Sequence, residues 1–129
     1  MTGKQAAAHL EHRARAALKA AHALFDMQEP DFYAEILFDC HLAIELALKA
    51  AYLRKNERIA PLTHDLSALA SELEKTLTPS EQNALEEMTE YAILSRYGDE
   101  EWFEKKVNRA NTQDWMQKAD HLLSKFLPL

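Results

Sequence analysis

The longest uninterrupted helical pattern in the chain runs from Ile36 to Lys55, and we expect this segment to form the central helix. Its apolar residues recur at steps of three and four, which places them on one stripe of a helix that faces a core. The stripe consists of Leu37, Cys40, Ile44, Ala47, Leu48 and Ala51. Ionisable residues are threaded through the same segment, so it combines a core-facing stripe with candidate chemistry.

The ionisable residues of this segment are spaced four apart. His41, Glu45 and Lys49 therefore stack along one line of the helix, with Glu45 in the favourable order for an ion pair with Lys49. Two interpretations stay open. The three side chains form a solvated flank whose salt bridge contributes about 0.3–0.5 kcal/mol. Alternatively, they form a polar cluster at a helix interface or ligand cleft, where burial is costly unless the cluster has a function.

Helical patterns also flank this segment. A nearly continuous apolar stripe predicts a first helix over residues 4–28, and Pro30 stops it. The turn that follows is short, so the first two helices should form an antiparallel hairpin. Thr78 and Glu81 have the spacing of a capping box, which predicts the start of a fourth helix that runs to about residue 95.

A third helix is expected between these, from Leu66 to about Leu77, with Thr63 as its cap. His64 and Asp65 would then lie in its first turn. A histidine beside an aspartate can act as an orienting or acid–base pair. Neighbouring side chains on a helix point in different directions, however, so a structural role is the alternative.

The C-terminal part begins with a stop at Gly98, followed by a loop or short helix that carries Trp102 and Phe103. Asn111 or Thr112 is placed to cap a last helix, whose apolar stripe comprises Trp115, Ala119, Leu122, Leu123 and Phe126. We see no linker or repeat, so residues 1–129 should form one domain.

Composition supports a helical fold. The chain has only two glycines and four prolines against 47% hydrophobic residues, too few for the turns of many short strands. Cys40 is the single cysteine, which excludes an intramolecular disulfide and favours a buried, reduced thiol. The N-terminus is too polar for a signal peptide and no run is long enough to span a membrane, so we expect a cytoplasmic protein.

The formal net charge is −6, which argues against nonspecific coating of nucleic acid. Two local basic clusters nevertheless occur, one around Arg54, Lys55 and Arg58 and one over residues 105–109. Each has the composition of a solvated helix end or of a binding patch. The histidines are dispersed and the two glycines cannot build a phosphate loop, so neither a metal site nor another cofactor is expected.

Three segments in order resemble the HEPN domain (higher eukaryotes and prokaryotes nucleotide-binding) family. They are Phe38–Leu53, Thr63–Leu66 and Tyr91–Tyr97, and the similarity extends over nearly the whole chain. The resemblance implies an antiparallel bundle of four long helices with a short C-terminal fifth. It also implies a homodimer, a nucleotide ligand, and in many members a small nucleotidyltransferase partner in a toxin–antitoxin pair.

Many members of the family are metal-independent ribonucleases that use an arginine and a histidine separated by four to six intervening residues. Arg96 stands in the matching region, but the positions for its histidine hold Glu101, Trp102 and Phe103. The resemblance therefore predicts a non-catalytic binding module, with a ribonuclease toxin that pairs Arg96 with His64 or His41 as the alternative. The ligand-binding residues expected are His41, Glu45, Lys49, His64, Asp65, Arg96 and Tyr97.

Overall fold

The computed structural model describes residues 2–128, with all of their side chains except those of Ser95 and Arg96. Within this range the chain forms helices and no strand, which confirms the all-α prediction. The elements are α1 (Gly3–Asp26), the 3-10 turn η1 (Pro30–Phe32), α2 (Tyr33–Asn56), α3 (Leu66–Ser71), α4 (Pro79–Tyr97), α5 (Glu100–Lys106) and α6 (Arg109–Phe126). No described helix has both the length and the apolarity needed to cross a membrane.

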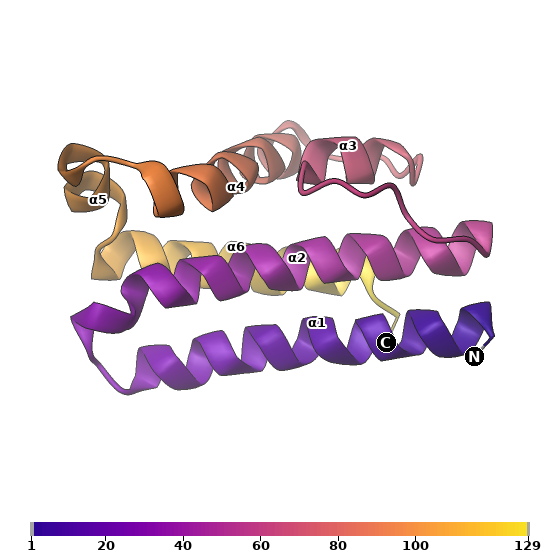
Figure 1. The fold of residues 1–129 in the computed structure, drawn as a ribbon, viewed down its shortest axis with the longest axis horizontal. Coiled ribbons are helices and arrows are strands. Elements are labelled where there is room, and N and C mark those ends of the chain that lie inside the picture. Colours follow the sequence, from indigo (N-terminus) through magenta and orange to yellow (C-terminus); the bar gives the residue numbers. More distant parts are fainter. Residues whose placement is uncertain (1, 129) are drawn as a thin grey trace.

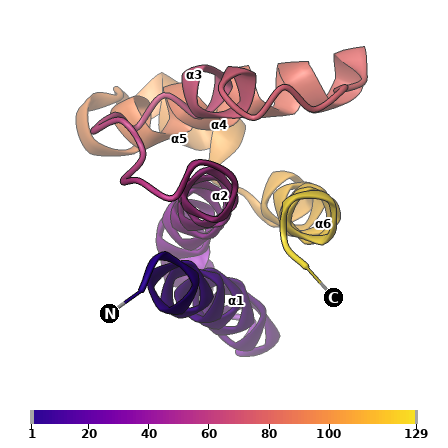
Figure 2. The ribbon, with the colours of Figure 1, turned by 90° about the vertical axis from the view of Figure 1, so that its right-hand side faces the viewer.

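The helix α2 lies at the centre of the molecule. It pairs with α1 in an antiparallel hairpin, runs beside α6, and is covered on its opposite side by α3 and α4 (Figure 1). Figure 2, which views the bundle from one end, shows α2 surrounded by these neighbours. A helix packed on several sides buries more than one stripe, and Cys40 is fully buried as predicted. Burial raises the pKa of its thiol to about 12.

The lengths of two helices differ from the prediction. The helix α3 ends at Ser71, and the chain then turns at Glu74, whose left-handed backbone (φ 56°) cannot continue a helix. The last helix α6 is 18 residues long, whereas a short one was expected. Asn108 caps it, because its side chain accepts a hydrogen bond from the backbone N–H of Asn111. The cap therefore lies three residues before Asn111 and four before Thr112, the two predicted positions.

Gly98 ends α4 as predicted, but for a steric reason. Its backbone is extended (φ −69°), so the left-handed conformation that favours glycine at helix ends is not used. A Cβ atom at this position would instead overlap the carbonyl oxygen of Leu94 and crowd the ring of Trp102. The glycine thus lets α5 turn back closely against the end of α4.

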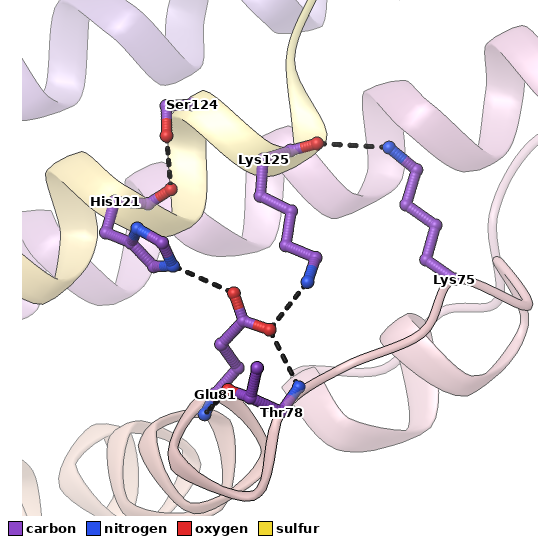
Figure 3. Close-up of polar contacts among 6 residues, drawn as sticks. All are labelled: Lys75, Thr78, Glu81, His121, Ser124 and Lys125. Atoms are coloured by element: carbon purple, nitrogen blue, oxygen red, sulfur yellow. Dashed lines mark hydrogen bonds and ion pairs between the residues drawn. The ribbon is translucent and has the colours of Figure 1, made fainter.

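The capping box of α4 is confirmed and also joins α4 to α6. The Glu81 carboxylate accepts the Thr78 backbone N–H at 2.8 Å, and it contacts Lys125 Nζ at 2.6 Å and His121 Nε2 at 2.8 Å (Figure 3). The Glu81 side chain is 7% exposed. Lys125 first, then the Thr78 N–H and His121, lower the pKa of Glu81 to about 2. The same side chain thereby caps one helix and anchors another.

Candidate functional site: a cavity between α2, α3 and α4

A cavity of about 450 Å³ opens between α2, the segment that precedes α3, and α4. Its lining combines apolar and aromatic side chains with a few polar groups: Phe38, His41, Leu42, Glu45, His64, Asp65, Thr89, Ala92, Ile93 and Tyr97. This volume and this mixture are typical of sites that bind small molecules.

The α2 wall of the cavity has a helical period. Phe38, His41, Leu42 and Glu45 follow one another at steps of three, one and three residues, which places them on one face of α2. This face is distinct from the core stripe around Ile44 and Leu48. His41 and Glu45 are only 5% and 6% exposed, so the solvated-flank interpretation is wrong for these two residues.

Glu45 is the polar centre of the cavity. Its Oε1 lies 2.8 Å from His64 Nδ1, and its Oε2 lies 3.3 Å from Lys49 Nζ. A buried carboxylate is costly unless it is paired and hydrogen-bonded, and these two contacts satisfy one oxygen each. The His64 side chain is 83% exposed, so the contact with the carboxylate can be reached from solvent.

The segment before α3 is where the structure corrects the sequence prediction. Asp65, not Thr63, caps α3, since its side chain accepts the backbone N–H of Ala68 at 3.2 Å. The Thr63 hydroxyl accepts the backbone N–H of Asp65 instead. Aspartate is as good a cap as threonine and stands next to the first apolar residue of the helix. His64 and Asp65 therefore precede the helix, and both line the cavity.

Thr89 fixes this segment against α4. Its hydroxyl accepts the backbone N–H of Leu66 at 3.0 Å and donates to the carbonyl oxygen of Leu85 at 2.8 Å. The first residue of α3 is thereby tied to the middle of α4. These hydrogen bonds therefore fix the position of His64 relative to Glu45, which lies on α2.

Five of the seven predicted site residues line this cavity: His41, Glu45, His64, Asp65 and Tyr97. Lys49 does not. It contacts Glu45 from the side and lines a separate apolar cavity of about 290 Å³, together with Leu53 and Leu62. The side chain of Arg96 lies outside the described residues. Among the described lining residues, two are carboxylates and none is a lysine or arginine.

The positions where the ribonuclease histidine would fall belong to α5 and contribute to packing. The Trp102 ring meets Tyr91 edge-on at a centroid distance of 5.5 Å, and Phe103 meets Trp102 in the same manner at 5.2 Å. An aromatic cluster that closes the end of the bundle therefore occupies this place. Across the described residues, no three His, Cys, Asp or Glu side chains are grouped as metal ligands would be.

Half of the cavity lining was missed by the sequence prediction, although part of it has a signal. Phe38 and Leu42 could have been found, because they continue the line of Glu45 on α2 at helical spacing. Thr89 and Ile93 stand eight and four residues before Tyr97 on α4, which is the same kind of signal. Only the fold shows that these two faces meet.

The comparisons with known proteins agree on the fold. The HEPN domain model matches residues 7–126. The crystal structure of TT1696 from Thermus thermophilus superposes with a TM-score of 0.76 over 92% of this chain and 93% of that chain. The two sequences are 21% identical, so this likeness concerns the fold alone. No curated protein matches the sequence.

Proposed function

The chain belongs to the HEPN domain family, and we propose that it is a non-catalytic binding module whose cavity takes the nucleoside part of a nucleotide. The observation that carries this proposal is the buried carboxylate of Glu45 in the wall of an otherwise apolar and aromatic cavity. A carboxylate in such a place favours a ligand that brings hydrogen-bond donors into an apolar site.

A nucleoside has the required chemistry. Its planar base can stack on an aromatic ring such as Phe38 or Tyr97, which is worth about 1–3 kcal/mol per base. The amino groups of the base and the hydroxyls of the sugar can donate to Glu45 and Asp65. Phosphates fit poorly beside these two carboxylates, because like charges repel. We therefore infer that the phosphates of a bound nucleotide point out of the cavity.

The test is calorimetric titration of the protein with nucleosides and with their monophosphates. We expect binding that Glu45→Gln weakens by about tenfold, which corresponds to the loss of one hydrogen bond to a charged group. Tyr97→Ala should also weaken binding, and since Tyr97 is 81% exposed this variant should keep the fold. Asp120→Asn is the matched control, because it removes a carboxylate that contacts His22 at 2.9 Å, outside the cavity.

The alternative is a metal-independent ribonuclease toxin. General acid–base cleavage needs a group that titrates near neutrality within hydrogen-bond reach of the reacting oxygens. The positions where the family places this histidine after Arg96 hold Glu101, Trp102 and Phe103, so we expect the purified protein to leave RNA intact. Cleavage without metal that is abolished by Arg96→Ala and by His64→Ala, with the helical content retained, would replace the binding-module proposal with the enzyme.

We also propose that the chain is a homodimer. Ile93 and Tyr97, which line the cavity, are 58% and 81% exposed, and neighbouring large apolar residues at the surface favour an interface. Sedimentation equilibrium at micromolar concentration should give twice the chain mass of 14.8 kDa. A single species at the monomer mass would contradict this.

A small nucleotidyltransferase is the second partner that we propose, on the basis of the family. A reading frame for such an enzyme beside the gene would favour a paired system of the toxin–antitoxin kind. Co-purification of the two chains is its direct test, and separate elution at micromolar concentration would exclude a stable pair.

A further inference from the structure

A second hollowed surface lies on the far side of α2, around the C-terminal segment Leu127–Pro128. One hollow, of about 520 Å³, lies between α1 and α6, and Arg15, Lys19 and His22 contribute to its lining. Leu127 and Pro128 line this hollow and a second one as well. Figure 2 shows the C-terminal end of the chain beside α1 and α6, away from α3 and α4.

The second hollow, of about 330 Å³, is also lined by cations. Arg54 and Lys55 reach it from the end of α2, and Lys75 reaches it from the loop before α4. Five lysines and arginines thus surround one short segment in a chain whose formal net charge is −6. We call these five residues, together with Leu127 and Pro128, the C-terminal saddle.

Two of the saddle cations are held by neutral groups. Arg15 Nη2 donates to the carbonyl oxygen of Pro128. Lys75 Nζ donates to the carbonyl oxygen of Lys125 at 3.0 Å, as Figure 3 shows. A carbonyl oxygen positions a cation but does not neutralise it. Lys19 has no carboxylate within ion-pair distance among the described residues. Asp120 and Glu11 also line the two hollows, but among the described residues neither forms an ion pair with Arg15, Lys19 or Lys75.

Other cations nearby are neutralised. Arg54 forms a two-point ion pair with the buried Glu11, and Lys125 is bound to Glu81. Lys55 lies 3.6 Å from Glu74, an exposed partner that solvent screens. Within the saddle, Arg15, Lys19 and Lys75 are therefore the cations without a carboxylate partner among the described residues.

We propose that the C-terminal saddle binds a chain of phosphates. Because its cations stand on both sides of Leu127–Pro128, the saddle suits a ligand with repeated negative charges better than a single small anion. The nearest aromatic ring, Phe126, is buried beneath Lys75, so the lining offers no exposed ring for base stacking. The saddle should therefore contact phosphates without selecting a base sequence. This goes beyond the cavity proposal, because the described lining of the cavity holds no lysine or arginine.

Two sources share this chemistry, namely the backbone of a single-stranded nucleic acid and inorganic polyphosphate. The probes are a fluorescein-labelled single-stranded oligonucleotide, measured by anisotropy, and unlabelled polyphosphate as competitor and as titrant in calorimetry. We expect binding at low salt, with about 20-fold loss between roughly 50 and 200 mM salt, because three phosphate contacts give a slope of about −2 on logarithmic axes. Whichever probe binds identifies the source.

The decisive variant is the triple substitution Arg15→Gln, Lys19→Gln and Lys75→Gln, which should weaken binding at least about tenfold and flatten the salt dependence. Its matched control removes three cations elsewhere, Lys105→Gln, Lys106→Gln and Lys118→Gln. Lys105 and Lys106 lie on α5 at the other end of the bundle (Figure 1).

Equal losses in the two triple variants would reduce the effect to net charge and overturn the proposal, as would the absence of binding by either probe at low salt. Glu45→Gln should leave phosphate-chain binding unchanged, because Glu45 lies in the cavity and not in the saddle. This variant therefore distinguishes a failure of the saddle proposal from a failure of the cavity proposal. A comparable loss in Glu45→Gln would assign the ligand to the cavity and overturn the saddle.

Discussion

Replacing Arg54 with alanine should lower the free energy of unfolding by about 2–3 kcal/mol. The guanidinium donates from Nε and Nη2 to the two carboxylate oxygens of Glu11, each at 2.8 Å. Glu11 is 5% exposed, so the substitution leaves a buried charge without its partner. The cost lies below the roughly 3–5 kcal/mol of a fully buried pair, because the Arg54 side chain is 41% exposed and water can enter when it is removed.

Denaturant unfolding of three variants isolates this effect. Lys105→Ala removes one partner of the exposed ion pair with Glu101 and should cost less than about 0.5 kcal/mol. The double substitution Glu11→Leu and Arg54→Met replaces the pair by apolar side chains, and we expect its stability to lie close to that of the native chain. If Arg54→Ala costs no more than Lys105→Ala, then the pair between α1 and α2 has no structural importance.

Features that depend on local sequence were predictable. The capping box at Thr78 and Glu81 rests on residues three apart, and the stop at Gly98 rests on a single residue. The buried Cys40 follows from its place in the apolar stripe of α2. In each case the information lies within one or two helical turns, where side-chain directions are fixed by the helix itself.

The candidate site depends on pairings that no local pattern contains. His64 meets Glu45 across 19 residues, and the contact forms only because α3 begins after Asp65 and leaves His64 outside the helix. Thr63 and Asp65 are both good caps, so the sequence alone leaves the direction of His64 undecided. The approach of Thr89 to this segment is likewise a result of how α4 packs on α2 and α3.

The saddle was not predicted for a related reason. Arg54 and Lys55 were recognised as a basic cluster, but the cluster was drawn along the sequence with Arg58. In the structure Arg58 instead donates to the Tyr52 hydroxyl, and the cations that join Lys55 come from α1 and from the loop before α4. Folding therefore gathers five cations around the C-terminal segment, next to the carboxylates of Glu11 and Asp120, whereas the described lining of the cavity has carboxylates and no lysine or arginine.

Acidification should destabilise the protein through Glu81. The folded pKa of this carboxyl is about 2, below its ordinary value of 4.5. Above pH 4.5 the group is ionised in both states, and its contacts with Lys125, Thr78 and His121 contribute fully. Between about pH 4.5 and 2 the unfolded chain takes up a proton that the folded chain does not, so stability falls as the pH falls through this window.

Denaturant unfolding at a series of pH values, with Glu81→Gln beside the native chain, measures this contribution. At pH 7 the substitution should cost about 2 kcal/mol, because hydrogen bonds to a charged group are lost. The difference between the two proteins should then shrink as the pH falls below about 4.5.

Asp39 has the opposite effect, since burial and then Glu35 raise its pKa to about 6, so its ionisation lowers stability as the pH rises from about 4 to 6. Asp39 is present in both the native chain and Glu81→Gln, so its contribution cancels in the difference between their stabilities.

The control is Glu86→Gln, at an exposed position of the same helix as Glu81, and it should show no such pH-dependent difference from the native chain. A constant difference between Glu81→Gln and the native chain from pH 7 to pH 2 would mean that the charge of the Glu81 carboxylate does not stabilise the fold.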